Sequence, residues 1–225
     1  GYMEELDKIL MRKQQKILGV LGILLPLLSV GLGLIGYWRG VNEPGWYESI
    51  SATYYANSGM MMIGLLFSLS LYYWAYKGYD KLDDIITSIA AVMAMGIVAF
   101  PCADGRATTA EYVGLFCLPL KVSGVIHTVC AIVLYAAFFV QTYRFTKHGA
   151  NVTAEKLKRN RVYYSCMVMM IVGMLFVLGT NVIECLAEYH YFVLVGECFL
   201  QLAFGTAWLV KAGSITALND KETSV

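Results

Sequence analysis

The sequence predicts an all-α polytopic membrane protein, a bundle of six transmembrane helices with both termini in the cytoplasm. Of its 225 residues, 58% are hydrophobic and only 15% are charged, whereas soluble proteins carry about 25% charged residues. Apolar stretches close to the roughly 20 residues that cross a bilayer recur along the chain. The length is used up by these stretches and short connections, so we expect one membrane domain and no separate soluble domain.

The ends of the chain are polar. Residues 1–16 form a charged leader, in which Gly1 and Tyr2 ahead of Met3 are interpreted as a cloning remnant. The first apolar run is too long for a cleavable signal peptide and has no small-residue cleavage site after it, so we expect it to remain as a helix. The predicted domains are therefore this leader, a membrane domain over 17–212 and a cytoplasmic tail over 213–225.

Hydrophobic stretches and helix-breaking residues define the bounds of the six predicted spans. Pro26 lies inside the first span, where a kink is tolerable because neighbouring helices can satisfy the freed carbonyl. Pro101 is expected to end the third span. The predicted spans cover about Ile17–Tyr37, Gly59–Tyr76, Ile85–Pro101, Pro119–Tyr143, Val162–Ile183 and Tyr191–Lys211.

The distribution of Lys and Arg predicts the orientation. All but three of the 17 fall in the leader, the turn at 77–84, the loop at 144–161 and the tail. The three others are Arg39, Arg106 and Lys121. The positive-inside rule then places both termini in the cytoplasm, and we predict a multi-pass protein of the bacterial cytoplasmic membrane. The mixed charges of AYKGYDKLDD predict a solvated turn on the inner face.

The predicted outer loops are rich in Tyr, Trp, Ser, Thr and carboxylates. The run WYESISATYY precedes the second span, where Trp and Tyr suit the membrane interface. An aromatic belt with a polar turn, capped by Asn57 or Ser58, explains its rings but not its clustered Glu and Ser. We therefore expect its side chains to hold an amphiphile at the headgroup level and to supply polar contacts: Trp46, Tyr47, Glu48, Ser49, Tyr54 and Tyr55.

Ionisable residues inside spans are costly and are by default paired or functional. His127 lies about two turns into the fourth span, with Ser123 one turn above it on the same face. The fifth and sixth spans add a second polar set that could line a pocket: Asn181, Glu184, His190 and Glu197. The alternative for each is a structural hydrogen bond between helices.

Three residues are candidates for catalysis. Ser51 could act as a nucleophile, with Ser49 and Thr53 as alternatives. His127 would be its general base and Asp104 an orienting acid, since such a triad is defined by geometry and not by order in the chain. No GxSxG elbow supports this assignment. Glu48 is a second candidate for the acid.

The sequence gives only weak indications of a metal site or a disulfide. The chain contains no HxxxH, HExxH or CxxC spacing, so no metal site is predicted, although Asp104, His127 and His190 could converge with Glu184 or Glu197. The sequence does not identify a cofactor. A disulfide between Cys102 and Cys117 is the favoured pairing on the outer face.

The segments SISATYY, GLLFSLSLYYWAYKGY and IHTVCAIVLYAAFFVQTYR together resemble the DRAM family, the damage-regulated autophagy modulators, whose relatives include proteins of GPI-anchor lipid remodelling. The resemblance implies six spans and an outward pocket associated with lipid handling, carried onto Ser49, Ser51 and His127. Ala52 stands where the family tends to have Asp, and Cys130 replaces a Gly usually found after the histidine. A carboxylate role would therefore move to Glu48.

A weaker resemblance is to the membrane hydrolases that include alkaline ceramidases and adiponectin receptors, which bring a Ser, an Asp and histidines together near zinc. The characteristic paired histidines near the C-terminus are missing from this chain.

The sequence therefore predicts a pocket that binds, and could process, a lipid or amphiphile; as an enzyme the protein would be a lipid hydrolase or transferase. A small transporter that conducts protons or a solute, and a structural or partner-binding subunit, are the alternatives. Membrane lipids are the expected partners. No basic stripe indicates nucleic acid, and homo-oligomerisation is left open.

Overall fold

The computed structural model describes residues 1–149, 151–183, 185, 189 and 191–220. Within these residues the chain forms six α-helices, two short 3-10 helices and a pair of two-residue strands. In chain order they are α1 (Tyr2–Trp38), η1 (Ser51–Tyr55), α2 (Gly59–Ala75), α3 (Lys81–Ala99), β1 (Tyr112–Val113), β2 (Leu118–Pro119), α4 (Leu120–Lys147), α5 (Ala154–Val182), α7 (Tyr191–Lys211) and η2 (Thr216–Leu218).

Each predicted span coincides with one of these helices, so the all-α class is confirmed. Five of the described helices are long and apolar enough to cross a membrane, and the sixth, α2, is a shorter apolar helix of 17 residues. α1 and α5 are longer than the spans expected there, because the charged leader and residues 154–161 continue these helices. Such helices are compatible with an integral membrane protein.

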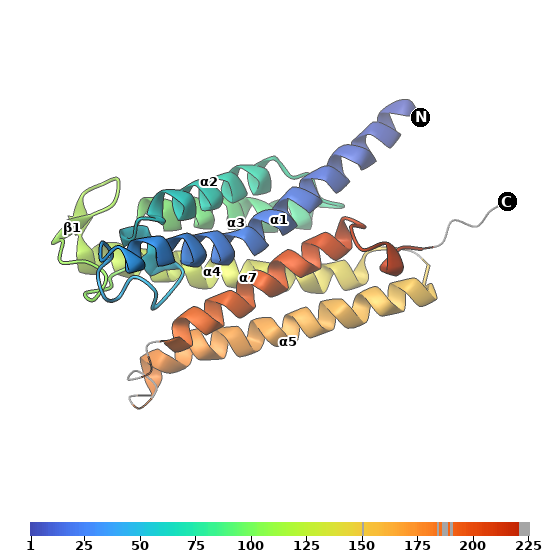
Figure 1. Ribbon diagram of the computed structural model, residues 1–225. Coiled ribbons are helices and arrows are strands. Elements are labelled where there is room, and N and C mark those ends of the chain that lie inside the picture. The colour runs from blue at the N-terminus through green and yellow to red at the C-terminus, as the bar shows by residue number, and fades with distance from the viewer. Residues whose placement is uncertain (150, 184, 186–188, 190, 221–225) are drawn as a thin grey trace.

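The helices form a ring in sequence order. Each packs against the next along the chain, and α7 returns to pack on α1, which closes the bundle (Figure 1). α1 begins and α7 ends at one end of the bundle, whereas η1 and the β1–β2 hairpin lie at the other. Here these are called the inner and outer ends.

Aromatic side chains fill the centre of the ring toward the inner end. Phe138 of α4 and Phe204 of α7 stack with ring centroids 4.0 Å apart, and Tyr73 of α2 packs against both. Trp208 lies edge-on to Tyr73, and all four side chains are at most 1% exposed. Buried aromatic rings in contact with one another leave little room for water. These four side chains form an aromatic layer that fills the bundle between its outer and inner ends.

Close helix contacts depend on glycine at the α5–α7 interface. A Cβ added to Gly173 would lie 2.5 Å from the Gly196 carbonyl oxygen, and a Cβ added to Gly196 would lie equally close to the Gly173 oxygen. Small residues that let two backbones approach are typical of helix association in membranes.

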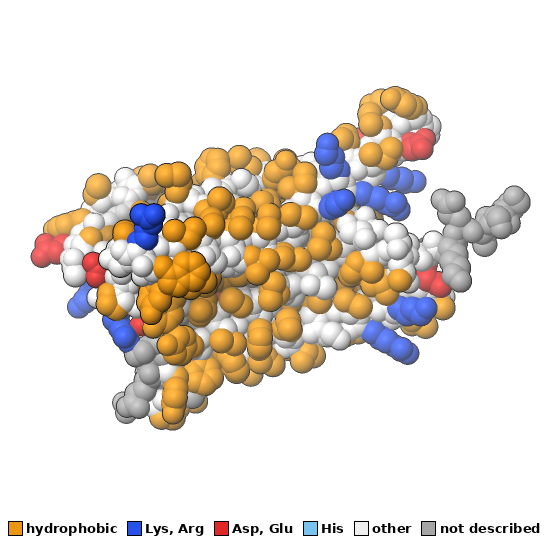
Figure 2. Space-filling model, in the orientation of Figure 1, with side chains coloured by type: hydrophobic (Ala, Val, Ile, Leu, Met, Phe, Trp, Pro, Cys, Tyr) orange, Lys and Arg blue, Asp and Glu red, His pale blue; other side chains and the backbone are white. Residues whose placement is uncertain are grey.

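The sides of the bundle, which face away from its core, are apolar. Figure 2 shows hydrophobic side chains across the middle of the bundle, with the charged side chains toward its two ends. Exposed examples from successive helices are Leu27, Phe67, Val92, Val129 and Val168. This pattern matches a surface in contact with lipid tails, since isolated soluble proteins rarely expose such large apolar areas.

The turn between α2 and α3 differs from the solvated surface predicted for it. Asp83 has no exposed surface, and Arg144 donates from Nε to its Oδ1. Arg144 also donates from Nη2 to Asp80 Oδ2 at 2.5 Å, and His148 Nε2 lies 3.2 Å from Asp83 Oδ2. Lys77, Asp80 and Lys81 are exposed as predicted. The prediction was wrong only at Asp83, because Arg144 of α4 supplies a cation that allows this carboxylate to be buried.

The favoured disulfide is also absent. Cys102 and Cys117 are both free. Cys117 occupies the exposed turn of the β1–β2 hairpin with a φ of 47°, while Cys102 follows the end of α3 and lies partly buried. Proximity to the same end of the bundle was therefore a poor guide to pairing, since a disulfide also needs Cα atoms within about 7 Å.

Candidate functional site

His127 is fixed by hydrogen bonds at both of its ring nitrogens. Nδ1 lies 2.8 Å from the Phe100 carbonyl oxygen, and Nε2 lies 3.0 Å from the Ser51 hydroxyl oxygen. A carbonyl oxygen can only accept, so Nδ1 carries the proton of the neutral ring and Nε2 is an acceptor for the Ser51 hydroxyl. This tautomer is the one that a general base for Ser51 requires.

The end of α3 supplies the acceptors for this arrangement. α3 stops at Ala99, just ahead of Pro101, and the last carbonyls of a helix have no partner within it. His127 takes the Phe100 carbonyl, and Ser123, one turn earlier on α4, donates to the Pro101 carbonyl at 2.8 Å. The pairing of Ser123 with His127 on one helix face, predicted from their spacing, thus joins α4 to the end of α3.

The carboxyl group of Glu197, on α7, contacts Ser51 and its neighbour Ile50. Its Oε2 accepts a hydrogen bond from the Ile50 backbone N–H, and its Oε1 lies 3.4 Å from the Ser51 hydroxyl. Ser49 supports the same turn, because its hydroxyl accepts from the Ala52 N–H at 2.9 Å. Ser51 therefore lies between a carboxyl group and an imidazole from two different helices.

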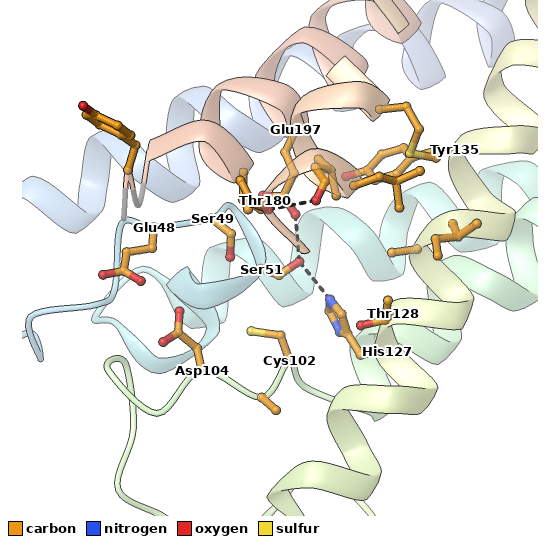
Figure 3. Close-up of a pocket in the computed structure, with 18 residues that line it drawn as sticks. Glu48, Ser49, Ser51, Cys102, Asp104, His127, Thr128, Tyr135, Thr180 and Glu197 are labelled. Atoms are coloured by element: carbon orange, nitrogen blue, oxygen red, sulfur yellow. Dashed lines mark hydrogen bonds between the residues drawn. The ribbon is translucent and has the colours of Figure 1, made fainter. Parts of the chain in front are cut away.

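These groups line one cavity of about 350 Å³ at the outer end, bounded by α4, α5, α7 and the loops at 48–51 and 102–104 (Figure 3). Figure 3 shows Ser51 and His127 next to each other, joined by a hydrogen bond, with Glu48 and Asp104 toward the loops. Ser51 is 9% exposed, and His127 and Glu197 are each 5% exposed. The volume is within the range of about 300–1,000 Å³ found for small-molecule sites.

The wall of the cavity changes character along its length. The loop side carries Glu48, Ser49 and Asp104, whereas the side between α4 and α5 carries Ile132, Met174, Leu178 and other apolar residues. Ile132 is 38% exposed and Leu178 39% exposed on the apolar surface of the bundle. A polar end joined to an apolar end matches the two parts of an amphiphile.

The structure brings together most of the predicted polar residues. Glu48, Ser49, Ser51, Asp104, His127 and Glu197 all line the cavity. Asp104 does not contact His127 among the described contacts: its Oδ1 accepts from the Arg106 backbone N–H at 3.0 Å. Glu48 forms an ion pair with Arg106, with Oε1 and Nε 3.1 Å apart. The Phe100 carbonyl, not a carboxylate, orients the histidine ring.

The four predicted aromatic ligands lie outside the cavity wall. Trp46 is 2% exposed and fills the space that Gly33 of α1 leaves open, where an added Cβ would lie 2.2 Å from the ring. Tyr47 stacks on Tyr191 with centroids 5.5 Å apart. These rings therefore fix the loop onto α1 and α7.

The other two rings fix the turn that carries Ser51. Tyr54 and Tyr55 pack edge to face at 4.9 Å, and the Tyr55 hydroxyl donates to the Cys102 carbonyl at 2.7 Å. Burial raises the pKa of Tyr55 well above its ordinary value, so this hydroxyl remains a donor. Residue type alone could not separate these anchoring roles from ligand contact.

Three predicted residues cannot be placed. Glu184 and His190 lie outside the described residues, and so does the side chain of Asn181. In the described part of this segment, Thr180, Tyr189 and Val193 line the cavity.

Two of the wall residues that were not predicted carry ionisable groups that Figure 3 labels. Tyr135 and Cys102 both face the cavity (Figure 3). Burial raises the pKa of the Cys102 thiol, and the nearby carboxylates Glu197 and Asp104 raise it further. A neutral thiol is a poor nucleophile, so Ser51 is the better candidate. Tyr135 was hidden by its position in an apolar run.

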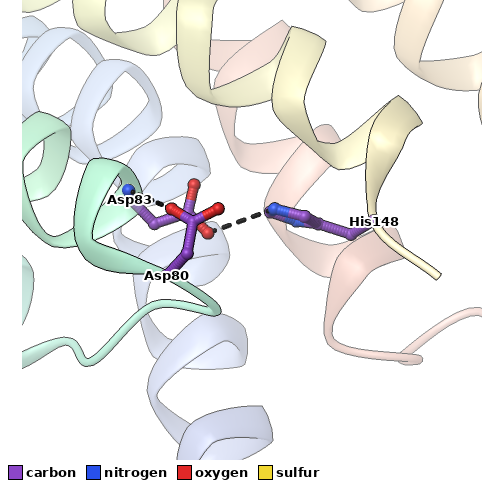
Figure 4. A group of neighbouring side chains, drawn as sticks. All are labelled: Asp80, Asp83 and His148. Atoms are coloured by element: carbon purple, nitrogen blue, oxygen red, sulfur yellow. Dashed lines mark hydrogen bonds and ion pairs between the residues drawn. The ribbon is translucent and has the colours of Figure 1, made fainter.

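Among the described residues, one group has ligand atoms close enough to hold a metal ion: Asp80, Asp83 and His148 at the inner end (Figure 4). Arg144 already pairs with both carboxylates. A cation in the same place would have to displace it, so we assign this group to the folding of the turn between α2 and α3.

Comparisons with protein-family models, curated proteins and solved structures found no match. The functional argument therefore rests on the geometry of the site. Its main feature is a serine hydroxyl hydrogen-bonded to a correctly oriented imidazole in a largely buried cavity, an arrangement that suits nucleophilic acyl transfer.

Proposed function

We propose that this chain is a six-span protein of the bacterial cytoplasmic membrane, with both termini in the cytoplasm, that binds a lipid or amphiphile in the outer cavity and cleaves an ester bond in it. The 3.0 Å contact between Ser51 Oγ and His127 Nε2 carries the proposal. The apolar wall toward Ile132 and Leu178 supports an acyl chain as the occupant of the inner part of the cavity.

In the proposed reaction Ser51 Oγ attacks the ester carbonyl carbon and gives its proton to His127 Nε2. The ester C–O bond then breaks, and the leaving alcohol takes that proton. Water next attacks the carbonyl carbon of the acyl–Ser51 ester and gives a proton to His127 Nε2. The bond between the acyl carbon and Ser51 Oγ then breaks, and His127 returns that proton to Oγ. The products are a carboxylic acid and free Ser51. Phe100 keeps Nδ1 protonated in both steps, while Glu197 positions the Ile50–Ser51 backbone.

The charge distribution supports the proposed orientation. The inner end carries the leader, the turn at 77–84 and the loop at 144–161, which hold most of the Lys and Arg. The positive-inside rule favours a cytoplasmic inner end. A DRAM-like pocket for lipid handling is consistent with this arrangement.

A transporter is less well supported, because the aromatic layer of Tyr73, Phe138, Phe204 and Trp208 lies between the cavity and the inner end. A conducting path for protons or solutes needs polar groups or water along the whole bundle. A purely structural subunit would not require the serine and the imidazole to share a cavity.

The test is covalent labelling. Purified protein in detergent is treated with a long-chain fluorophosphonate, and the modified peptide is identified by mass spectrometry. We expect label on Ser51 and a loss of labelling in Ser51→Ala and His127→Ala. The matched control is Thr128→Val, which removes a hydroxyl from the same cavity wall that donates to the Gly124 carbonyl of its own helix.

Hydrolysis of p-nitrophenyl esters of increasing chain length provides the second measurement. We expect rates to rise with chain length in the wild type and to fall about a thousandfold or more in Ser51→Ala. Labelling that persists at full rate in Ser51→Ala would show that the proposed nucleophile is wrong. Co-purified lipid without labelling would reduce the proposal to binding.

A further inference from the structure

A second cavity, of about 380 Å³, lies at the inner end, between α1, α4, α5, α7 and the segment around η2. It is far along α4 from His127, and its lining is mainly polar. Its charged Lys, Arg and acidic wall residues, within the described part of the chain, are four cations and one carboxylate: Arg12, Lys156, Arg159, Lys211 and Asp220.

Two of these cations are held by neutral groups. Lys156 is 9% exposed, and its Nζ donates to the Gly149 carbonyl at 2.7 Å. Lys211 Nζ lies 4.5 Å from the centroid of the Tyr79 ring and 5.4 Å from that of Phe145. Carbonyl and ring contacts orient an ammonium group but leave its full charge in place.

The carboxylates nearby pair directly with other cations. Asp220 pairs with Arg159, whose Nη2 lies 3.0 Å from its Oδ2, and the same guanidinium donates to the Leu218 carbonyl. The Asp83 carboxylate forms an ion pair with Arg144 and also contacts His148. Among the described carboxylates none forms an ion pair with Lys156 or Lys211.

Partly buried cations without counter-charges are costly, and an anion that enters the cavity removes that cost. We propose that the inner cavity binds a phosphate group, with Lys156 and Lys211 as its main cations and Arg12 closing the site from α1. Ammonium and guanidinium groups are the usual phosphate ligands of proteins. The inference does not depend on the chemistry of the outer cavity.

The phosphate could belong to a phospholipid or to a soluble compound. Basic pockets between helices at the cytoplasmic side of membrane proteins bind anionic headgroups, and the volume exceeds that of phosphate alone. Both sources share the chemistry that the cavity recognises, and they are separable by experiment.

The first experiment uses the wild-type protein in detergent and records its melting temperature. Sodium phosphate is compared with sodium chloride at equal ionic strength, and micelles doped with phosphatidylglycerol are compared with micelles doped with monoolein. We expect a rise of about 3 °C with a phosphate-bearing probe. A rise with inorganic phosphate indicates a soluble ligand, and a rise with phosphatidylglycerol alone indicates a lipid. No rise in either comparison overturns the proposal.

The second experiment localises the site. The double variant Lys156→Gln/Lys211→Gln is compared with Lys158→Gln/Arg161→Gln, which removes the same charge from exposed positions of α5 outside the cavity. We expect affinity for the active probe to fall about tenfold or more in the first variant only. Lys156→Arg, which keeps the charge, should retain binding. Equal affinity in the two double variants would contradict the assignment, whether both bind as wild type or both are weakened alike.

Discussion

The two histidines at opposite ends of α4 have contrasting environments. His127, near the outer end, is held by the Phe100 carbonyl and the Ser51 hydroxyl, which carry no formal charge. His148, at the inner end, lies 3.2 Å from the Asp83 carboxylate, which also pairs with Arg144. His127 faces the outer cavity and a nucleophile, whereas His148, which lines the inner cavity, contacts the carboxylate of a buried ion pair.

This difference separates a site for chemistry from a site for stability. A neutral imidazole with an accepting nitrogen can take a proton from Ser51 and return it. The Asp83 carboxylate is already engaged, since Arg144, His148 and the Tyr79 backbone N–H all contact it. The inner network should therefore control folding, and the outer pair should control reactivity.

The largest expected effect is the loss of the inner network. Asp83→Asn removes a carboxylate with no exposed surface and leaves Arg144 without its buried partner. Breaking a buried ion pair in this way typically costs about 3–5 kcal/mol. We expect the free energy of unfolding in detergent to fall by about that amount, while Ser51 in the protein that remains folded keeps its wild-type rate of fluorophosphonate labelling.

Asp80→Asn is the matched control. Asp80 pairs with the same arginine but its side chain is 54% exposed. Asn is also a good N-cap, so it can keep the contacts of Asp80 with the Leu82 and Asp83 N–H groups. The loss of stability should be much smaller than for Asp83→Asn. Equal losses would mean that burial does not decide the strength of these pairs.

The sequence predicted the helices well because the signal for each is local. Apolar runs of sufficient length define the spans, and α7 has the predicted limits, Tyr191 and Lys211. His127 was identified by the same logic, since an ionisable residue inside an apolar run is rare. Ser51 was identified by its polar neighbours in an otherwise hydrophobic chain.

The rest could not be predicted because it depends on contacts between distant segments. The Phe100 carbonyl orients His127, but a backbone group has no signature in the sequence. Arg144 and Asp83 are 61 positions apart, so a buried pair looked like two solvated charges. Trp46 is a residue type that often contacts ligands, yet here its ring packs against α1, in the space left because Gly33 has no side chain.

An intermediate effect is expected at Glu197, which we assign as a positioning residue. Glu197→Ala leaves the Ile50 N–H without its acceptor, and an unsatisfied buried donor costs about 1–3 kcal/mol. The turn that carries Ser51 should loosen, so both stability and the rate of fluorophosphonate labelling should fall. Glu197→Gln keeps an oxygen acceptor and should restore both. If Gln labels as slowly as Ala, the carboxylate charge itself is required.

The smallest expected effect is a dependence of stability on pH at the inner end. Burial lowers the pKa of His148, a shift that Asp83 opposes and that Lys211 and Arg144 reinforce. The unfolded chain, with a histidine pKa of about 6.5, therefore binds this proton more readily than the folded protein. Stability should fall as the pH drops below about 6.5 and remain constant above it. The measurement is the melting temperature between pH 5 and 8 for wild type and His148→Gln. The difference between the two curves isolates His148 from other titrating groups, and parallel curves would show that this histidine is not the inner-end proton acceptor.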